Sequence, residues 1–143
     1  MHAPGFVIAA TQSSSGKTLV TLGLIRAFAR RGLKVGGFKV GPDYIDPAFH
    51  LAAGSVRCPN LDSWAMQLPT LARLAEEAAS EVDIVVGEGV MGLFDGGPEG
   101  RGSTADVASL LGLPVVLTVD AKGMGQSVAA LAAGFAEFRD DVD

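Results

Sequence analysis

The segment 10–18, ATQSSSGKT, has the Gly-Lys-Thr ending of a phosphate-binding loop. In such a loop the backbone N–H groups point at phosphate oxygens, the lysine reaches the β and γ phosphates, and the last hydroxyl binds Mg²⁺. The helix predicted to follow adds the positive end of its dipole. The residues predicted to bind ATP are Ser13, Ser14, Ser15, Gly16, Lys17 and Thr18. Lys17 is also predicted to act in catalysis, and Thr18 to bind Mg²⁺.

The serines of this loop stand where many such loops have glycine. Thr11 replaces the first glycine of the usual spacing, and Ser14 replaces another. Because serine substitutes for glycine without strain only where φ is negative, we expect Ser14 and Ser15 to have negative φ. The alternative is a polar turn in which Ser15 caps the next helix and Lys17 is solvated.

A second lysine follows the next predicted strand, in the segment 38–47, FKVGPDYIDP. Lys39 stands at the carboxyl end of that strand, beside the predicted phosphate loop. An ammonium group there could stabilise a phosphoryl group during its transfer. The alternative is a solvated lysine at the end of a strand.

Two aspartates and a tyrosine follow within the same segment. Asp43, Tyr44 and Asp46 could bind metal and substrate, since they stand at the sheet edge where ligands bind. Each aspartate also has a structural alternative: Asp43 as a turn residue, and Asp46 as the N-cap of a helix with Pro47 in its first turn. Spacing alone leaves both interpretations open. His50 is expected on this short helix, without visible partners for a metal role.

An acidic, glycine-rich segment follows the third predicted strand, at 83–97, DIVVGEGVMGLFDGG. Glu88 stands at the end of this strand, where P-loop proteins hold Mg²⁺ directly or through water. Asp83, at the start of the strand, is predicted to be structural. Asp95 is a candidate catalytic residue, with a turn aspartate as the alternative. Cys58 is predicted to be a small apolar filler and not a nucleophile, because no histidine lies near it in the sequence.

These candidates depend on strands that alternate with helices. Apolar runs predict strands at 6–10, 34–40, 82–86 and 115–119, and helical spacing predicts helices at 17–31, 69–80, 104–111 and 126–138, with a short helix ending at Gly54. Such alternation predicts an α/β fold of three layers, with a doubly wound, mainly parallel sheet. The phosphate loop between the first strand and helix makes this a fold of the P-loop NTPase type. Four strands make a thin sheet and the sequence ends after a helix, so we expect the fold to be incomplete.

The composition excludes several classes of protein. Hydrophobic residues make up 48% of the chain, which is enough for a packed core and too many for a disordered segment. The net charge of -5 argues against nucleic acid as a partner, because binding it needs a concentrated basic face. No run approaches the roughly 20 apolar residues of a membrane span, the lone Cys58 excludes an internal disulfide, and the N-terminus lacks a signal peptide's basic region. We therefore expect one cytoplasmic domain without nucleic-acid or membrane partners.

Four segments carry a resemblance to a known family. ATQSSSGKT, FKVGPDYIDPAFH, NLDSWAM and GEGVMGLFDG, in this order and spacing, resemble the N-terminal synthetase domain of the cobyrinic (or hydrogenobyrinic) acid a,c-diamide synthases. The resemblance covers nearly the whole chain, and the second and fourth segments are far more specific than the phosphate loop. Wider relatives are dethiobiotin synthetase and the P-loop ATPases of division-site placement and plasmid partition. Many relatives have glycine where this chain has Ala10 and Ser14.

The resemblance implies a ligase of cobalamin biosynthesis that amidates a corrinoid polycarboxylate with ATP and glutamine. The a and c carboxylates of cobyrinate or hydrogenobyrinate are activated as acyl phosphates and then attacked by ammonia. The ammonia comes from glutamine, hydrolysed by a C-terminal amidotransferase domain that is absent from residues 1–143. Residues 1–143 would then be a truncated N-terminal ATP-binding synthetase domain, which need not be active by itself.

The resemblance also implies roles for single residues. Lys39 would stabilise the transferring phosphoryl group, and Thr18 and Glu88 would bind Mg²⁺. The positions linked to substrate handling or to the phosphorylated intermediate are Asp43, Tyr44, Asp46 and Asp95.

The motifs are compatible with two other functions. A relative that acts on another tetrapyrrole, such as nickel-sirohydrochlorin, would have nearly the same motifs. A partition-type ATPase that does not amidate usually has a lysine early in the phosphate loop, and this sequence has none near Thr11 or Gln12. The oligomeric state is open as well, with a homodimer among the options.

Overall fold

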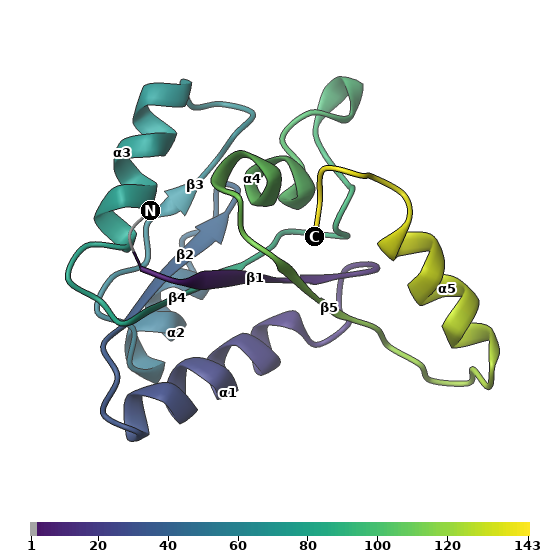
Figure 1. The fold of residues 1–143 in the computed structure, drawn as a ribbon, viewed down its shortest axis with the longest axis horizontal. Coiled ribbons are helices and arrows are strands. Elements are labelled where there is room, and N and C mark those ends of the chain that lie inside the picture. Colours follow the sequence, from purple (N-terminus) through teal and green to yellow (C-terminus); the bar gives the residue numbers. More distant parts are fainter. Residues whose placement is uncertain (1–2) are drawn as a thin grey trace.

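The computed structural model describes residues 3–143, in which a 5-stranded sheet separates two layers of helices (Figure 1). The elements along the chain are β1 (Gly5–Ala10), α1 (Lys17–Arg30), β2 (Val35–Val40), α2 (Asp46–Ala53), β3 (Asn60–Leu61), α3 (Leu68–Ala78), β4 (Ile84–Glu88), the 3₁₀ turn η1 (Pro98–Gly100), α4 (Thr104–Leu111), β5 (Val115–Thr118) and α5 (Ser127–Ala136).

Neighbouring strands run parallel, in the order β3-β2-β4-β1-β5. Helices α1 and α2 lie on one face of the sheet and α3 and α4 on the other (Figure 1). Parallel strands need such crossover helices, so the predicted three-layer, doubly wound α/β fold is confirmed. The prediction of four strands is wrong, because β3 pairs with the end of β2. A strand of two residues is too short to give a periodic signal in the sequence.

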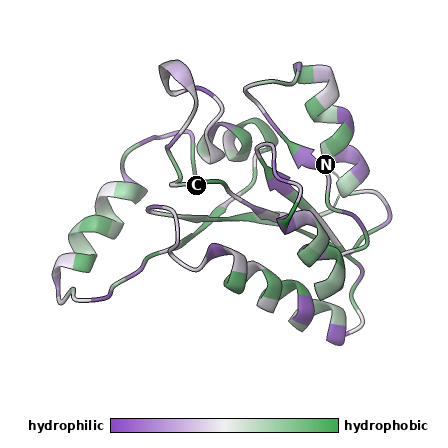
Figure 2. Cartoon of the chain, turned by 180° about the vertical axis from the view of Figure 1, so that it is seen from behind, coloured by the Kyte–Doolittle hydropathy of each residue, from purple (hydrophilic) through white to green (hydrophobic). Residues whose placement is uncertain are grey.

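Successive residues of the central strands face opposite layers. Val7 of β1 and Val85 of β4 belong to the core under α3 and α4, whereas Ile8 and Val86 pack with Ile25 of α1. All five are fully buried, as expected for parallel strands covered on both faces. In Figure 2 hydrophilic and hydrophobic residues alternate along α1, as its amphipathic spacing predicts.

The register of the sheet aligns the carboxyl ends of its strands. Lys39 of β2 pairs with Glu88 of β4, and Ile8 of β1 pairs with Glu88 on the other side. The loops that follow β1, β2 and β4 therefore begin at one edge of the sheet. This is the edge at which ligands bind in open α/β sheets.

Helix α5 lies beyond β5, to one side of the two helical layers (Figure 1). The residues of α5 are all at least partly exposed. Phe135 of this helix stacks on Phe94, with ring centroids 5.4 Å apart. Aromatic stacking therefore attaches α5 to the loop after β4.

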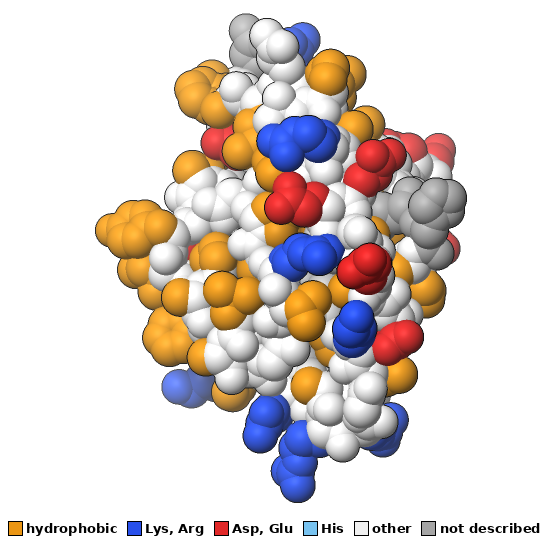
Figure 3. Space-filling view, turned by 90° about the vertical axis from the view of Figure 1, so that its left-hand side faces the viewer, with side chains coloured by type: hydrophobic (Ala, Val, Ile, Leu, Met, Phe, Trp, Pro, Cys, Tyr) orange, Lys and Arg blue, Asp and Glu red, His pale blue; other side chains and the backbone are white. Residues whose placement is uncertain are grey.

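The surface carries charges of both signs. On the face drawn in Figure 3, acidic and basic side chains alternate over the middle, and basic ones gather at the lower end. Within residues 3–143, none of the helices is both long and apolar enough to cross a membrane. The expectation that neither nucleic acid nor a membrane is a partner stays a prediction.

Candidate nucleotide-binding site

The loop between β1 and α1 leaves backbone N–H groups available to a ligand. Gly16 is the N-cap of α1 in the left-handed region (φ 84°, ψ 11°), and no side chain in the described part of the protein caps this helix start. A Cβ atom built on Gly16 would meet nothing within 4 Å, so the space in front of the loop is open. The Ser15 hydroxyl donates to the backbone oxygen of Gln12 at 3.1 Å, and the alternative in which Ser15 caps the helix is wrong. Free N–H groups at a helix N-terminus attract anions such as phosphate.

Ser14 has a positive φ of 62°. The expectation of negative φ is therefore wrong for Ser14, although it holds for Ser15, which is not among the residues with positive φ. The chain turns sharply twice before the helix, at Ser14 and at Gly16, and both turns use the left-handed region. A residue other than glycine pays about 1–2 kcal/mol for this conformation.

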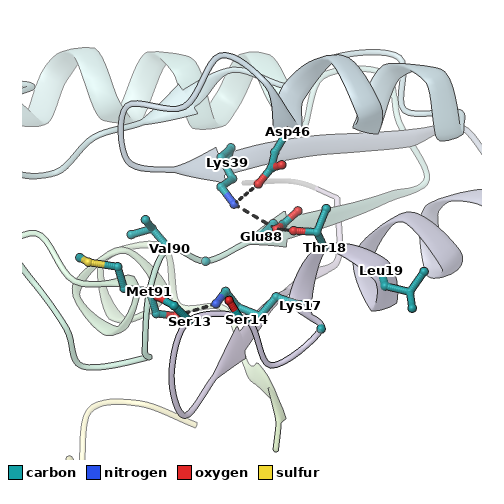
Figure 4. A pocket seen from close by; sticks show the side chains of 12 residues that line it. Ser13, Ser14, Lys17, Thr18, Leu19, Lys39, Asp46, Glu88, Val90 and Met91 are labelled. Atoms are coloured by element: carbon teal, nitrogen blue, oxygen red, sulfur yellow. Dashed lines mark hydrogen bonds and ion pairs between the residues drawn. The ribbon is translucent and has the colours of Figure 1, made fainter. Parts of the chain in front are cut away.

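Glu88 is the centre of a buried polar cluster at the end of β4 (Figure 4). Its Oε1 accepts hydrogen bonds from Thr18 Oγ1 at 2.5 Å and from Lys39 Nζ at 3.0 Å. Its Oε2 lies 2.6 Å from His50 Nε2. The Glu88 side chain is fully buried, so both oxygens need such partners. The structure thus brings together three of the predicted site residues, Glu88, Thr18 and Lys39.

The charges in this cluster stabilise one another. Burial disfavours the charged form of Glu88, but hydrogen bonds from His50 and Thr18 and the charge of Lys39 lower its pKa to about 2. Burial also opposes the charge of Lys39, yet its contacts with Asp46 and Glu88 raise its pKa above the usual value. The cluster therefore contains a carboxylate and an ammonium group at neutral pH.

Asp46 pairs with Lys39 and does not cap helix α2. Its Oδ2 lies 2.6 Å from Lys39 Nζ, while Ile45 is the N-cap and Pro47 lies in the first turn. The N-cap prediction for Asp46 is wrong, because an ion pair with a buried lysine competes for the same carboxylate. Asp43 fixes the helix start instead: its Oδ1 accepts from the N–H of Ile45 at 2.8 Å and of Asp46 at 3.1 Å.

Asp43 thus has the turn role of its structural alternative and also lies near the cluster. Its Oδ2 is 3.8 Å from Lys39 Nζ. Partial burial opposes its charge, but the hydrogen bonds from the Ile45 and Asp46 backbone lower the pKa of Asp43. Asp43 is therefore an anion at neutral pH.

Lys17 reaches across the phosphate loop to the segment after β4. Its Nζ donates to the backbone oxygen of Met91 at 2.6 Å, and only 8% of the residue is exposed. The alternative in which Lys17 is solvated is therefore wrong. Burial and then the charge of Lys39 lower the pKa of Lys17. Met91 has a φ of 49°, and strained backbone of this kind clusters at functional sites.

A cavity of about 390 Å³ opens in front of these residues (Figure 4). The predicted site residues that line it are Ser13, Ser14, Gly16, Lys17, Thr18, Lys39, Asp46 and Glu88. Four other predicted residues do not line it among those the structure describes, namely Ser15, Asp43, Tyr44 and Asp95. The phosphate loop and the Glu88 cluster thus share one cavity.

The remaining candidates do not line this cavity. Tyr44 is 88% exposed. Asp95 Oδ2 accepts from the N–H of Gly92 at 2.8 Å, which is the contact of a turn aspartate. Asp83 accepts from the N–H of Lys34 at 2.7 Å, away from the site at the other end of β4. This contact agrees with the structural role predicted for Asp83.

Sequence reasoning missed the contacts that His50 and Cys58 make. His50 is fully buried against Glu88, and Cys58 Sγ lies 3.2 Å from His50 Nδ1. The sequence did not indicate this contact. The burial that raises the pKa of Cys58 to about 12 agrees with the prediction that Cys58 is not a nucleophile. One signal was present: Asp46 and His50 are four residues apart, which places them on one face of the predicted helix.

The donors at this edge fit the phosphates of a nucleotide together with Mg²⁺. Within the part of the chain that is described, no group of three or more His, Cys, Asp or Glu side chains could hold a metal ion. Mg²⁺ needs no such group, because it takes one or two protein ligands and completes its shell with phosphate oxygens and water. Thr18 Oγ1 and Glu88 Oε1 are hard oxygen ligands of the kind it prefers, 2.5 Å apart, and both residues line the cavity.

Comparison with known proteins gives relatives with one shared name. The chain is 55% identical over 139 residues to a hydrogenobyrinate a,c-diamide synthase of Brucella anthropi, a match of 96% of this chain and 32% of the relative. A protein of the same name from Rhodobacter capsulatus is 57% identical over 136 residues, 92% of this chain and 31% of the relative. The Rhizobium meliloti protein is 53% identical over 138 residues, again 96% of this chain and 32% of the relative. The chain spans about a third of the length of these curated relatives.

A protein-family model gives the broader assignment. The model described as the CobQ/CobB/MinD/ParA nucleotide binding domain matches residues 6–142. This match includes the phosphate loop, the Glu88 cluster and every strand of the sheet except the first residue of β1. The chain belongs to the CobQ/CobB/MinD/ParA nucleotide binding domain family.

Proposed function

We propose that the protein containing this chain amidates the a and c carboxylates of hydrogenobyrinate, with ATP and glutamine-derived ammonia, in cobalamin biosynthesis. The observation that carries this proposal is the meeting of Lys39, Thr18 and Glu88 at the open phosphate loop. The reaction and the substrate come from the names of relatives at 53–57% identity. These names do not favour the nickel-sirohydrochlorin or the partition-type alternative, and they favour hydrogenobyrinate over cobyrinate.

The phosphate loop would bind ATP as a substrate. The open N–H groups from Ser13 to Thr18 would contact its phosphate oxygens, and Lys17 would turn from the Met91 carbonyl toward the β and γ phosphates. Thr18 and Glu88 would hold Mg²⁺, which would supply positive charge next to the phosphates. Their shared position at the cavity supports this assignment.

Lys39 would assist the transfer of the γ-phosphoryl group. A substrate carboxylate oxygen attacks the γ-phosphorus, the bond to the β–γ bridging oxygen breaks, and ADP leaves with that electron pair. Two anions approach each other in this step, so a fixed ammonium lowers its barrier. The raised pKa of Lys39, caused by Asp46 and Glu88 against the effect of burial, supports a charged side chain in this role.

Ammonia would complete the amide. It attacks the carbonyl carbon of the acyl phosphate, phosphate leaves with the electrons of the C–O bond, and the nitrogen loses a proton. We propose that a glutamine-hydrolysing unit outside residues 1–143 supplies this ammonia. The length of the relatives, about three times that of the chain, leaves room for such a unit.

The acidic residues beside Lys39 would act on the substrate side. Asp43 and Asp46 would repel a polycarboxylate, so we assign them to the orientation of ammonia or to a metal bridge. Tyr44, which is exposed, would contact the macrocycle, and Asp95 would act with the phosphorylated intermediate. The lowered pKa of Asp43, which its backbone hydrogen bonds produce against the effect of burial, supports an anionic role.

The test is amidation by the full-length protein that contains this chain. Purified protein is given ATP, Mg²⁺, hydrogenobyrinate and glutamine labelled with ¹⁵N at the amide, and the product is weighed by mass spectrometry. We expect two successive incorporations of label, each replacing a hydroxyl by an amino group. Cobyrinate and nickel-sirohydrochlorin are offered in parallel reactions.

Two controls make the result specific. Free ammonium replaces glutamine, which separates the synthetase reaction from glutamine hydrolysis. Lys17→Ala should abolish amidation with either nitrogen source, since Lys17 is the phosphate-loop lysine. ATP-dependent self-association without any labelled product would contradict the proposal and favour the partition-type alternative.

A further inference from the structure

A row of three side chains runs from the loop after α2, through α2 itself, to Glu88 at the cavity. Cys58 Sγ lies 3.2 Å from His50 Nδ1, and His50 Nε2 lies 2.6 Å from Glu88 Oε2. The other oxygen of Glu88 accepts from Thr18 and Lys39. The two sides of one carboxylate thus have different partners: His50 on the buried side, and the cavity residues on the other.

We propose that His50, oriented by Cys58, is a positioning residue that fixes Glu88 so that its Oε1 faces Thr18 and the phosphate loop. The inference rests on the proposed function only in that Glu88 is taken as a Mg²⁺ ligand. It assigns a role to two residues, His50 and Cys58, that do not line the cavity themselves.

The thiol of Cys58 selects one tautomer of His50. Burial, followed by the charge of Glu88, raises the pKa of Cys58 to about 12, so the sulfur keeps its proton. The S–H group then donates to Nδ1, which leaves the ring proton on Nε2. Nε2–H points at Glu88 Oε2, a carboxylate oxygen that can only accept. In this arrangement one ring nitrogen faces a donor and the other faces an acceptor.

The fold leaves His50 little freedom to move. Its side chain is fully buried, and its backbone oxygen accepts from the N–H groups of Gly54 and Ser55 at the end of α2. A Cβ atom at Gly37 of β2 would lie 2.8 Å from Ser55 Oγ and 3.3 Å from His50 Nδ1, so glycine at that position leaves space for both side chains. A ring held in this way can fix the rotamer of the carboxylate that it contacts.

Residues that hydrogen-bond to a metal ligand are known to change how tightly the site binds its metal. An imidazole or carboxylate that orients a ligand typically contributes 10–100-fold to metal affinity or activity. Loss of the Nε2–H donor would leave Glu88 Oε2 buried without a partner and would release the side chain to rotate. The defect should therefore appear first in metal binding and not in the binding of metal-free nucleotide.

The experiment measures metal binding directly in the full-length protein. Mn²⁺, a paramagnetic substitute for Mg²⁺, is titrated by electron paramagnetic resonance in the presence of a non-hydrolysable ATP analogue. A fluorescent ATP analogue reports nucleotide affinity without metal. The variants are His50→Leu, which removes the donor, and His50→Gln, whose amide can donate to Glu88. The matched control is Leu71→Ala, a core change away from the cavity that also lowers stability.

We expect His50→Leu to weaken Mn²⁺ binding by about 10-fold or more, with metal-free nucleotide affinity within about twofold of the wild type. His50→Gln should restore much of the loss, and Leu71→Ala should leave Mn²⁺ affinity unchanged. Folded His50→Leu protein with wild-type Mn²⁺ affinity would overturn the inference. A loss equal to that of Leu71→Ala would also overturn it, because it would show a general effect of lowered stability.

The Cys58 variants decide the question if His50→Leu does not fold. Cys58→Ser keeps a donor for Nδ1, whereas Cys58→Ala removes it. We expect weaker Mn²⁺ binding in Cys58→Ala and a smaller change in Cys58→Ser. ¹⁵N spectra of the imidazole should show the Nε2–H tautomer in the wild type and in Cys58→Ser, which have the donor, but not in Cys58→Ala. Equal Mn²⁺ affinity in both variants and the wild type would overturn the inference. Failure of the wild type to amidate would contradict the proposed function alone, since Mn²⁺ binding is measured independently.

Discussion

Lys39 and Glu88 occupy paired positions on adjacent parallel strands, and Lys39 Nζ lies 3.0 Å from Glu88 Oε1. The pair is buried, with Lys39 only 4% exposed and Glu88 fully buried. Asp46 gives the same ammonium a second carboxylate at 2.6 Å. A lysine between two carboxylates is held in one place, which is what a group that stabilises a transferring phosphoryl group requires.

Replacement of Lys39 by methionine should lower the rate of amidation more than the binding of ATP. Methionine keeps most of the side-chain volume but removes the charge that would meet the transferring phosphoryl group. We expect kcat to fall by about 100–1,000-fold, the usual effect of losing one donor to developing charge, while KM for ATP changes little. Steady-state kinetics with ammonium as the nitrogen source measure both.

The control for this variant is Lys34→Met, just before the start of the same strand, where the side chain is exposed. Its kcat should equal that of the wild type. A Lys39→Met enzyme whose kcat is unchanged, or whose defect lies only in KM, would show that Lys39 binds substrate without acting in the transfer.

Acid should remove the stability that Glu88 contributes. The pKa of Glu88 is about 2 in the folded protein against an ordinary value of 4.5. A depressed pKa means that this stability is present above the unfolded value and is lost as the pH falls through the folded one. The shift corresponds to something on the order of 3 kcal/mol. Urea unfolding should give a higher free energy of unfolding for the wild type than for Glu88→Gln at neutral pH. This difference should narrow from about pH 4.5 downward.

Other carboxylates also titrate in that range, and the comparison between variants separates them. Glu77→Gln on α3 serves as the control, because Glu77 makes an exposed pair with Arg73, and such pairs contribute little. The free energy of unfolding of this variant should differ little from that of the wild type at every pH. A gap for Glu88→Gln that stays constant down to about pH 3 would refute the assignment of the shift to Glu88.

Local sequence signals predicted much of the fold and part of the site. The apolar run of β1, the Gly-Lys-Thr ending and the helical spacing of α1 all lie within about one supersecondary unit, so each supports the others. The meeting of Lys39 and Glu88 followed from topology, because parallel strands bring their carboxyl ends to one edge. These predictions needed no knowledge of long-range side-chain contacts.

The missed features all depend on such long-range contacts. Strand β3 exists because it pairs with β2, and its two residues carry no period of their own. Asp46 has a good sequence context for an N-cap, but the nearby Lys39 takes its carboxylate. His50 meets Glu88 only because α2 packs beside β2, where Gly37 leaves space. The sequence shows each residue type but not which of two competing partners is closer.

Asp43→Asn should impair amidation and leave the fold intact. The amide oxygen of asparagine can still accept the N–H groups of Ile45 and Asp46, which hold the start of α2. The charge is lost, however, and with it the proposed orientation of ammonia. We expect a lower amidation rate with ammonium and ATP, at an unchanged melting temperature.

Asp62→Asn is a matched control for this change. Asp62 makes the same type of turn contact, with Oδ1 accepting from the N–H groups of Trp64 and Ala65, both at 3.1 Å. It is not among the described residues that line the nucleotide cavity. Amidation that is unchanged in Asp43→Asn, or equally lowered in Asp62→Asn, would leave Asp43 with its turn role alone.

Ser14→Gly should keep ATP binding and stabilise the protein slightly. Ser14 has a φ of 62°, and glycine removes the steric cost of that conformation while adding entropy to the unfolded chain. The two effects nearly offset each other, so the free energy of unfolding should rise by at most about 1 kcal/mol. Ser14→Val should do the opposite, because a β-branched residue is a genuine outlier at positive φ. Urea unfolding and titration with a fluorescent ATP analogue measure the two quantities.

Ser15→Gly distinguishes backbone strain from any general effect of glycine in the loop. Ser15 is not among the residues with positive φ, and its hydroxyl donates to Gln12 at 3.1 Å. Glycine there removes a hydrogen bond and adds chain entropy without relieving strain, so stability should fall by about 0.5–1 kcal/mol. Opposite signs for Ser14→Gly and Ser15→Gly are therefore expected. If both glycine variants lost stability equally, only Gly16 would need the left-handed conformation in this loop. Ser14 would then hold its position at no conformational cost.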